Sequence, residues 1–162
     1  MNTAVNVNIS EIKVMESPAI LSCVGLGSCV GVTLYDPKKK IGGLAHIMLP
    51  DSRASKKNIN IGKFADTAIE WMIQEMLKNG ATLKGLQAKI FGGANMFPDL
   101  TSQPQLMIGE RNVKAIRAIL KEYSIPLLAK DIGGSVGRTI YFETETGLVI
   151  VRMLKIKEEK IY

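Results

Sequence analysis

The chain contains one histidine, His46, and two cysteines, Cys23 and Cys29. Histidine is the side chain whose ordinary pKa lies nearest neutrality, so chemistry that needs an imidazole must use His46. A thiol beside an imidazole forms a nucleophile with its base, because the imidazole increases the availability of the reactive thiolate. These residue types predict attack by a cysteine on a carbonyl carbon, provided that the fold brings the two side chains together.

A hairpin around the turn at residues 36–40 is the expected way to bring Cys29 and His46 together. Strand-like runs flank this turn, whose sequence is DPKKK. A hairpin centred near Pro37 and Lys38 pairs Cys29 directly with His46, with β-carbons about 4.5 to 5.5 Å apart on one face. A slip of one residue places the two side chains on opposite faces, so the prediction depends on the register.

Glycines precede the nucleophile candidate in the segment Gly25-Leu26-Gly27-Ser28. Glycine lets a backbone turn sharply and approach a substrate closely. The backbone N–H groups of Gly27, Ser28 and Cys29 are candidates to hold an oxyanion formed during the attack. Spacing alone also allows Cys29 to be a small packing residue and His46 to be a hydrogen-bonded core or surface group.

Six sequence blocks follow one another along the chain. They are GLGSCVGV at Gly25–Val32, GLAHIMLPDS at Gly43–Ser52, KFADTAIEWM at Lys63–Met72, KIFGGANMF at Lys89–Phe97, IGERN at Ile108–Asn112 and DIGGSVGR at Asp131–Arg138. Together these blocks resemble the CheD family of chemoreceptor glutamine deamidases. They span nearly the whole chain apart from its two ends, which makes the resemblance far more specific than one glycine-rich tripeptide.

The resemblance implies hydrolysis of glutamine side chains in methyl-accepting chemoreceptors to glutamate, with release of ammonia, by a Cys-His-Thr triad. Cys29 and His46 match the first two members, whereas Cys23 occupies the place of the threonine. A thiol is a weaker hydrogen-bond partner than a hydroxyl. Two interpretations of Cys23 therefore stay open, as a third catalytic element or as packing, and a backbone carbonyl of Cys23 or Ser22 is an alternative group to orient the imidazole.

Other functions are compatible with a cysteine and a histidine. A thioester that met an amine before water would give transglutaminase-like transfer, and a groove that accepted a main chain would give peptide hydrolysis. A regulatory module of the chemotaxis system, which binds receptors with little catalysis, is the alternative from another class. The resemblance also implies a CheC-type phosphatase of the response regulator as a partner.

Strand and helix patterns predict an α+β fold with packed, mostly antiparallel β-sheets, sandwich-like and flanked by helices. Apolar stripes with helical spacing run through residues 64–77 and 113–123. Strands are expected near residues 20–24, 30–35, 42–48, 87–91, 127–131, 138–142 and 148–156. A single CheD-like domain is expected over residues 1–162, with a charged, frayed tail at 158–162.

Composition narrows the classes of partner and cofactor. The net charge of +6 favours acidic partners without choosing among them. Basic clusters at residues 38–40 and 53–57 lack interleaved aromatic residues, so they are interpreted as solvated surface and not as a nucleic-acid site. Neither metal-ligand spacing nor a phosphate-binding loop occurs in the sequence, so no metal or cofactor is expected.

Location and substrate contacts are expectations of a similar kind. Long apolar runs are missing from the sequence, and the two cysteines suit a reducing compartment, so a cytoplasmic protein without membrane insertion is expected. Asn95, Arg111 and Arg138 are candidates for a rim that contacts the receptor.

Overall fold

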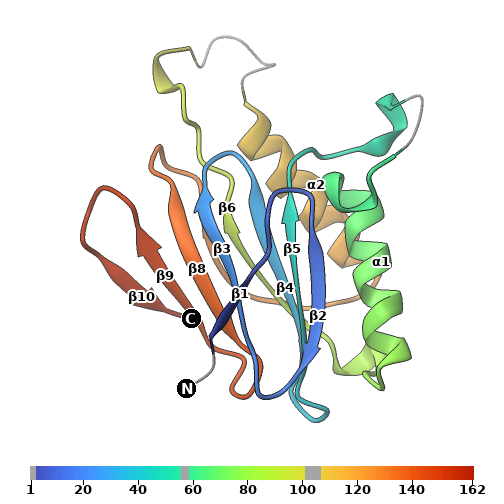
Figure 1. Ribbon diagram of the computed structural model, residues 1–162. Helices are drawn as coiled ribbons and strands as arrows, with labels where there is room; N and C mark the ends of the chain where they lie inside the picture. Colours follow the sequence, from blue (N-terminus) through green and yellow to red (C-terminus); the bar gives the residue numbers. More distant parts are fainter. Residues whose placement is uncertain (1–2, 56–58, 101–106) are drawn as a thin grey trace.

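Two five-stranded β-sheets and two α-helices make up the described part of the chain, residues 3–55, 59–100 and 107–162 of a computed structural model (Figure 1). The first sheet has the strand order β1-β3-β8-β9-β10 and the second has the order β2-β5-β4-β6-β7. Neighbouring strands are antiparallel except for the parallel pairs β1 with β3 and β6 with β7.

The elements follow one another from strands to helices and back to strands. The strands are β1 Ala4–Asn6, β2 Ile12–Glu16, β3 Ile20–Leu26, β4 Val30–Asp36, β5 Ile41–Ile47, β6 Gln87–Gly92, β7 Leu127–Ile132, β8 Arg138–Glu143, β9 Val149–Met153 and β10 Glu159–Ile161. The helices are α1 Ala65–Lys78 and α2 Ile108–Glu122, and short 3-10 turns lie at Ser52–Ala54, Ile61–Lys63, Leu83–Gly85 and Pro98–Leu100.

Three layers result, because both helices pack on the outer face of the second sheet and the first sheet covers its inner face (Figure 1). Apolar residues of both helices and of β4, β5 and β6 form one core. The inter-sheet cluster forms the other core, and its buried members are Val7, Leu21, Cys23, Leu26, Tyr35, Leu44, Phe91, Ile140, Phe142, Val149 and Val151. Every residue of β4 and β5 is buried because these central strands are covered on both faces.

The predicted α+β, sandwich-like fold is confirmed, and each expected strand and helical stripe corresponds to an element of the structure. Three strands were not expected from the sequence: β1, β2 and β10. All three are short and have no buried residue, so they do not produce a strong apolar pattern. β2 nevertheless forms the edge beside β5, the strand that contains the only histidine.

The register predicted for the hairpin of β4 and β5 is wrong by two positions. His46 lies opposite Gly31, not opposite Cys29. The turn has four residues, since the backbone N–H of Lys40 donates to the carbonyl of Asp36, which pairs with Ile41. Because side chains alternate with a period of two, this shift leaves Cys29 diagonal to His46 and on the same face of the sheet.

The frayed tail expected at residues 158–162 is also wrong. Residues Glu159–Ile161 form β10, which pairs with β9. The Tyr162 hydroxyl donates to the Asp131 carboxylate at 2.6 Å, and the Lys89 ammonium donates to the Tyr162 carbonyl at 2.9 Å. The hydrogen bond to Asp131 raises the pKa of Tyr162 to about 12. The last residues are therefore held against the rest of the chain by specific contacts.

Candidate active site

Cys29 and His46 both face the space between the two sheets. Cys29 comes directly before β4, is half-buried and packs against the inter-sheet cluster. His46 lies near the end of β5 and is 3% exposed. Gly31, which pairs with His46, allows the sheets to come close, because a β-carbon there would lie 2.9 Å from Ile140 Cδ1 of the opposite sheet. The fold thus places both side chains on the same face of the second sheet, in diagonal positions.

The segment between β1 and β2 holds His46 by three hydrogen bonds. The imidazole Nδ1 lies 3.0 Å from the Val7 carbonyl oxygen. The backbone N–H of His46 donates to the Glu11 carbonyl at 3.0 Å, and its carbonyl accepts from the Ser10 N–H at 2.9 Å. A carbonyl can only accept, so Nδ1 carries the proton and Nε2 of the neutral ring has a free lone pair. That is the tautomer that a general base needs.

Burial sets the protonation of both side chains. It lowers the pKa of His46, against smaller opposite effects of the Val7 hydrogen bond and of Glu11. It also raises the pKa of the Cys29 thiol. At neutral pH the pair is therefore a thiol and a neutral imidazole, not a preformed ion pair. Among the described residues no hydrogen bond joins the two side chains, so proton transfer would have to accompany the attack itself.

The loop before β4 is held through its carbonyl groups. Each of three consecutive carbonyls accepts a hydrogen bond from a group outside the loop: Gly27 from the Ala94 N–H at 2.8 Å, Ser28 from Asn112 Nδ2 at 3.0 Å and Cys29 from the Gly93 N–H at 2.9 Å. The N–H groups of the same three residues donate to no acceptor within the described ranges. Within the part of the chain that the structure describes, three backbone donors next to the thiol are therefore without an acceptor.

Gly92 and Gly93 show why the loop after β6 is rich in glycine. Both have positive φ, +107° and +64°, a region that favours glycine. A β-carbon at Gly92 would also lie 2.4 Å from the Cys29 carbonyl oxygen. The two glycines therefore let this loop approach and hold the Cys29 backbone.

Cys23 is fully buried in the inter-sheet cluster. Burial raises the pKa of its thiol far above the ordinary value, and the neighbouring Cys29 adds to the rise. The group that binds Nδ1 of His46 is the Val7 carbonyl, so the expectation that a carbonyl of Cys23 or Ser22 takes this part is wrong. Ser22 contacts Val7 instead of His46: the Ser22 carbonyl accepts a hydrogen bond from the Val7 N–H at 2.7 Å.

The three rim candidates have different positions. Arg138 is 2% exposed and forms a buried ion pair with Asp131, so its assignment to a receptor-binding rim is wrong. Arg111 lines a surface pocket of about 700 Å³ with Leu49 and Phe64. The Asn95 N–H donates to the Gly134 carbonyl at 2.8 Å, which joins two loops near Cys29.

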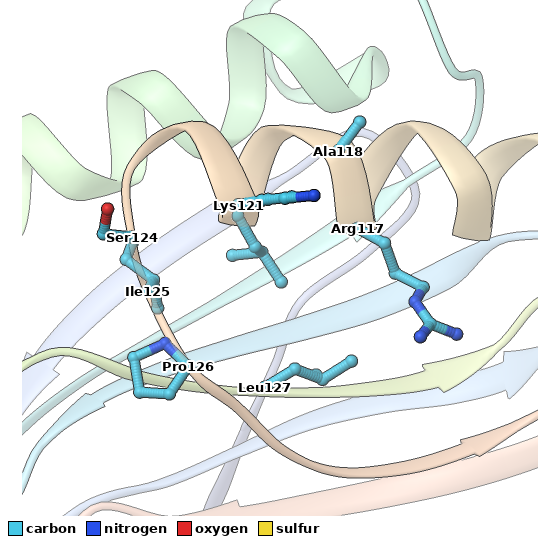
Figure 2. A pocket seen from close by; sticks show the side chains of 8 residues that line it. Arg117, Ala118, Lys121, Ser124, Ile125, Pro126 and Leu127 are labelled. Atoms are coloured by element: carbon cyan, nitrogen blue, oxygen red, sulfur yellow. The ribbon is translucent and has the colours of Figure 1, made fainter.

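A separate pocket of about 740 Å³ lies between the end of α2 and the start of β7 (Figure 2). Arg117 and Lys121 lie on its helical side, and Pro126 and Leu127 form the opposite side (Figure 2). None of the candidate site residues lines it. Over the described ranges, no group of three His, Cys, Asp or Glu side chains could hold a metal ion, and no helix is long and apolar enough to cross a membrane.

Sequence reasoning did not single out two residues of this site, Val7, which acts through its carbonyl, and Asn112, which acts through its side chain. Asn112 lies in α2, is fully buried and donates to the backbone on both sides of the site. Its sequence signal was a polar residue within the stripe of α2 and within the IGERN block. A polar side chain at a buried helical position is unusual unless it is hydrogen-bonded.

Comparison with known proteins places the chain in a family. A family model described as CheD chemotactic sensory transduction matches residues 48–153. The chain is 50% identical to a probable chemoreceptor glutamine deamidase CheD of Caldanaerobacter subterraneus subsp. tengcongensis over 91% of both chains. It is 45% identical to a protein of the same name from Oceanobacillus iheyensis, over 98% of this chain and 95% of that protein. The chain belongs to the CheD family.

The matches differ in whether they include the candidate residues. The family-model match begins at Met48 and leaves out Cys29 and His46. The Oceanobacillus alignment covers 98% of the chain and therefore includes both. Among solved structures, the hypothetical protein YfiH of Bacillus licheniformis aligns with 76% of this chain and 49% of its own, at 15% identity and a TM-score of 0.46. A likeness this weak supports no conclusion on function.

Proposed function

We propose that this protein is a chemoreceptor glutamine deamidase that hydrolyses specific glutamine side chains of methyl-accepting chemoreceptors to glutamate. Relatives at 45–50% identity over most of the chain have this activity in their names, as probable. The observation that supports the chemistry is that Cys29 and His46 lie on the same face of the second sheet in diagonal positions, with Nδ1 bound to Val7 and Nε2 without a partner among the described residues. No cofactor or metal takes part in this proposal.

The first half of the reaction forms a thioester. Sγ of Cys29 attacks the side-chain amide carbon of the receptor glutamine while Nε2 of His46 takes the thiol proton. The tetrahedral oxyanion is held by the backbone N–H groups of Gly27, Ser28 and Cys29, which have no other acceptor within the described residues. His46 then gives its proton to the amide nitrogen, the C–N bond breaks, and ammonia leaves.

Water completes the turnover. His46, neutral again, accepts a proton from water as the water oxygen attacks the thioester carbon. The second tetrahedral intermediate breaks its C–S bond and leaves a glutamate side chain, and the thiolate recovers its proton from His46. The net reaction consumes one amide and one water and releases one carboxylic acid and one ammonia. A neutral receptor side chain thus becomes an acidic one.

A second candidate function is a binding module that contacts receptors and a CheC-type phosphatase with little catalysis. Two observations favour it. Cys23 replaces the threonine expected from the family resemblance, and burial raises the pKa of Cys29, which lowers the thiolate fraction. The deamidase accounts for two further observations, the tautomer of His46 and the backbone N–H groups of residues 27–29 that have no acceptor among the described residues. A pure binding module needs neither of them.

Mass spectrometry of a receptor fragment separates these functions. The purified protein is incubated with a cytoplasmic chemoreceptor fragment, with and without a primary amine, and binding is measured in parallel. Deamidation adds about 1 Da at each converted glutamine, whereas transglutaminase-like transfer adds the amine at the same side chain. Binding without any mass change, with several matched receptors, would sink the deamidase and leave the binding module.

A further inference from the structure

The Asn112 side chain joins the segment that carries the nucleophile to the segment that carries the base. Its two Nδ2 hydrogens go to two different carbonyls, those of Ser28 and Met48, each at an N···O distance of 3.0 Å. Ser28 precedes Cys29, and Met48 lies two residues after His46. One buried amide from the helical layer therefore contacts both sides of the candidate site.

These two carbonyls lie where the β4–β5 ladder ends. Val30 and Ile47 form the last pair of that ladder, so Ser28 and Met48 lie just outside it. Beyond this pair the two segments no longer pair with each other: one is the loop that contains Cys29, and the other continues toward α1. Asn112 replaces the missing ladder bonds with a side-chain bridge at the position that sets the separation of Cys29 from His46.

The chemistry of the bridge requires an amide. Both partners are carbonyl oxygens, which only accept, so the NH₂ group must face them and the amide orientation is fixed. Aspartate has no N–H group and leucine has no donor at all. Serine has the single donor of its hydroxyl and can serve one carbonyl but not both.

We infer that Asn112 is a positioning residue that fixes Cys29 relative to His46, an inference that deepens the proposed function and rests on it. Asn112 does not contact the substrate or exchange protons. The apolar residues Ile116 and Leu120 of the same helix already bury α2 against the sheet, so the amide is not needed to attach the helix. Its distinct contribution is the register of two backbone segments at the site.

The test uses Asn112→Leu and Asn112→Ser with Thr144→Val as the matched control. Thr144 is likewise fully buried and makes two hydrogen bonds to backbone groups, both of Ala19: its hydroxyl accepts from the Ala19 N–H at 2.9 Å and donates to the Ala19 carbonyl at 3.1 Å. It is not placed in the active site. Thr144→Val therefore loses two buried side-chain-to-backbone hydrogen bonds, as Asn112→Leu does, but at a place outside the candidate site.

Two readouts are combined. The first is the rate of alkylation of Cys29 by iodoacetamide against pH, in wild type, His46→Ala and the three variants. Cys23 lies on the same tryptic peptide, between Lys13 and Lys38, so fragment-ion mass spectrometry assigns the modified thiol. The second is kcat and KM on the receptor fragment, with melting temperatures and circular dichroism to establish folding.

The expected result is that Asn112→Leu shifts the alkylation profile to that of His46→Ala. A misplacement of about 1 Å costs on the order of 100-fold, so kcat should fall between about 10-fold and 100-fold while KM changes little. The alkylation profile and kcat of Asn112→Ser should lie between those of Asn112→Leu and wild type. If Asn112→Leu does not fold, Asn112→Ser provides the test. Thr144→Val should lower the melting temperature and keep the wild-type profile and kcat.

Three outcomes would overturn the inference. The first is that folded Asn112 variants keep the wild-type alkylation profile and kcat. The second is that Thr144→Val loses as much kcat as the Asn112 variants, and the third is that the alkylation profile of Cys29 is the same with and without His46. The alkylation assay needs no receptor, so it separates this inference from the proposed function. Absent glutamine conversion together with a profile that depends on His46 and Asn112 would reject the deamidase and retain the positioning role.

Discussion

Nδ1 of His46 lies 3.0 Å from the carbonyl oxygen of Val7, a residue in the short connection between β1 and β2. The Val7 N–H donates in turn to the Ser22 carbonyl of β3 at 2.7 Å. Val7 therefore joins the first sheet to the imidazole on the second. Because the contact uses a backbone carbonyl, replacing the Val7 side chain does not remove it, and its role must be tested through the position of the segment.

A substitution at Gly62 can test the position of the segment between β1 and β2. A β-carbon at Gly62 would lie 2.1 Å from the Ser10 carbonyl oxygen, and the Ser10 N–H donates to the His46 carbonyl. Gly62→Ala should therefore push the segment away and shift the imidazole. We expect kcat on the receptor fragment to fall between about 10-fold and 100-fold. The free energy of unfolding should decrease by about 1 to 3 kcal/mol in urea denaturation, as for other overpacked sites.

Gly85→Ala is the matched control for Gly62→Ala. A β-carbon there would lie 2.7 Å from Thr82 Oγ1 and 2.8 Å from Asp36 Oδ2, at the other end of β4 from Cys29. It should lower stability without changing kcat. Equal losses of kcat in both variants, or unchanged kcat in a folded Gly62→Ala variant, would contradict the role given to the segment.

The lowered pKa of His46 predicts a pH dependence of stability. The unfolded chain binds a proton at His46 near its ordinary pKa of 6.5, whereas the folded protein binds it only at lower pH. The free energy of unfolding should therefore fall as pH drops below about 6.5 and stop falling from this source below the folded pKa. Urea denaturation between pH 5 and 8 should show a smaller fall in His46→Gln, and identical curves would refute the pKa direction.

The buried ion pair of Arg138 and Asp131 predicts a large loss of stability on removal of one partner. The Arg138 side chain is 2% exposed and also donates to the carbonyls of Gly133 and Val136. Arg138→Met leaves a largely buried carboxylate unpaired, which should reduce the free energy of unfolding by about 3 to 5 kcal/mol. Removing Arg152 from its exposed pair with Glu159 should have a much smaller effect in the same urea titration.

The layers of the fold, and the side chains that share a face of a sheet or helix, could be predicted from the sequence. Central strands such as β4 and the stripe of α1 are long and apolar, so their pattern is set by burial. The hairpin register was missed by two positions because four residues, not two, form the turn after Asp36. The shared face of Cys29 and His46 survived, since an even shift preserves the alternation of side chains.

Contacts made by backbone groups or by isolated polar residues could not be read from the sequence. Val7 orients the imidazole through its carbonyl, which every residue possesses. Asn112 bridges two carbonyls that are far apart in sequence from it and from each other. The tail was misjudged because its charged composition does not indicate the pairing of β10 with β9 or the contacts of Tyr162 with Asp131 and Lys89.

The most direct test of the central claim compares the alanine variants of the two cysteines on a receptor fragment. Cys29 is half-buried on the same face of the second sheet as His46, whereas Cys23 is fully buried with a strongly raised pKa. Glutamine-to-glutamate conversion is followed by mass spectrometry as a gain of about 1 Da per site, the mass change of amide hydrolysis. The account predicts no conversion by Cys29→Ala and continued conversion by a folded Cys23→Ala. Conversion by Cys29→Ala at the wild-type rate would contradict it.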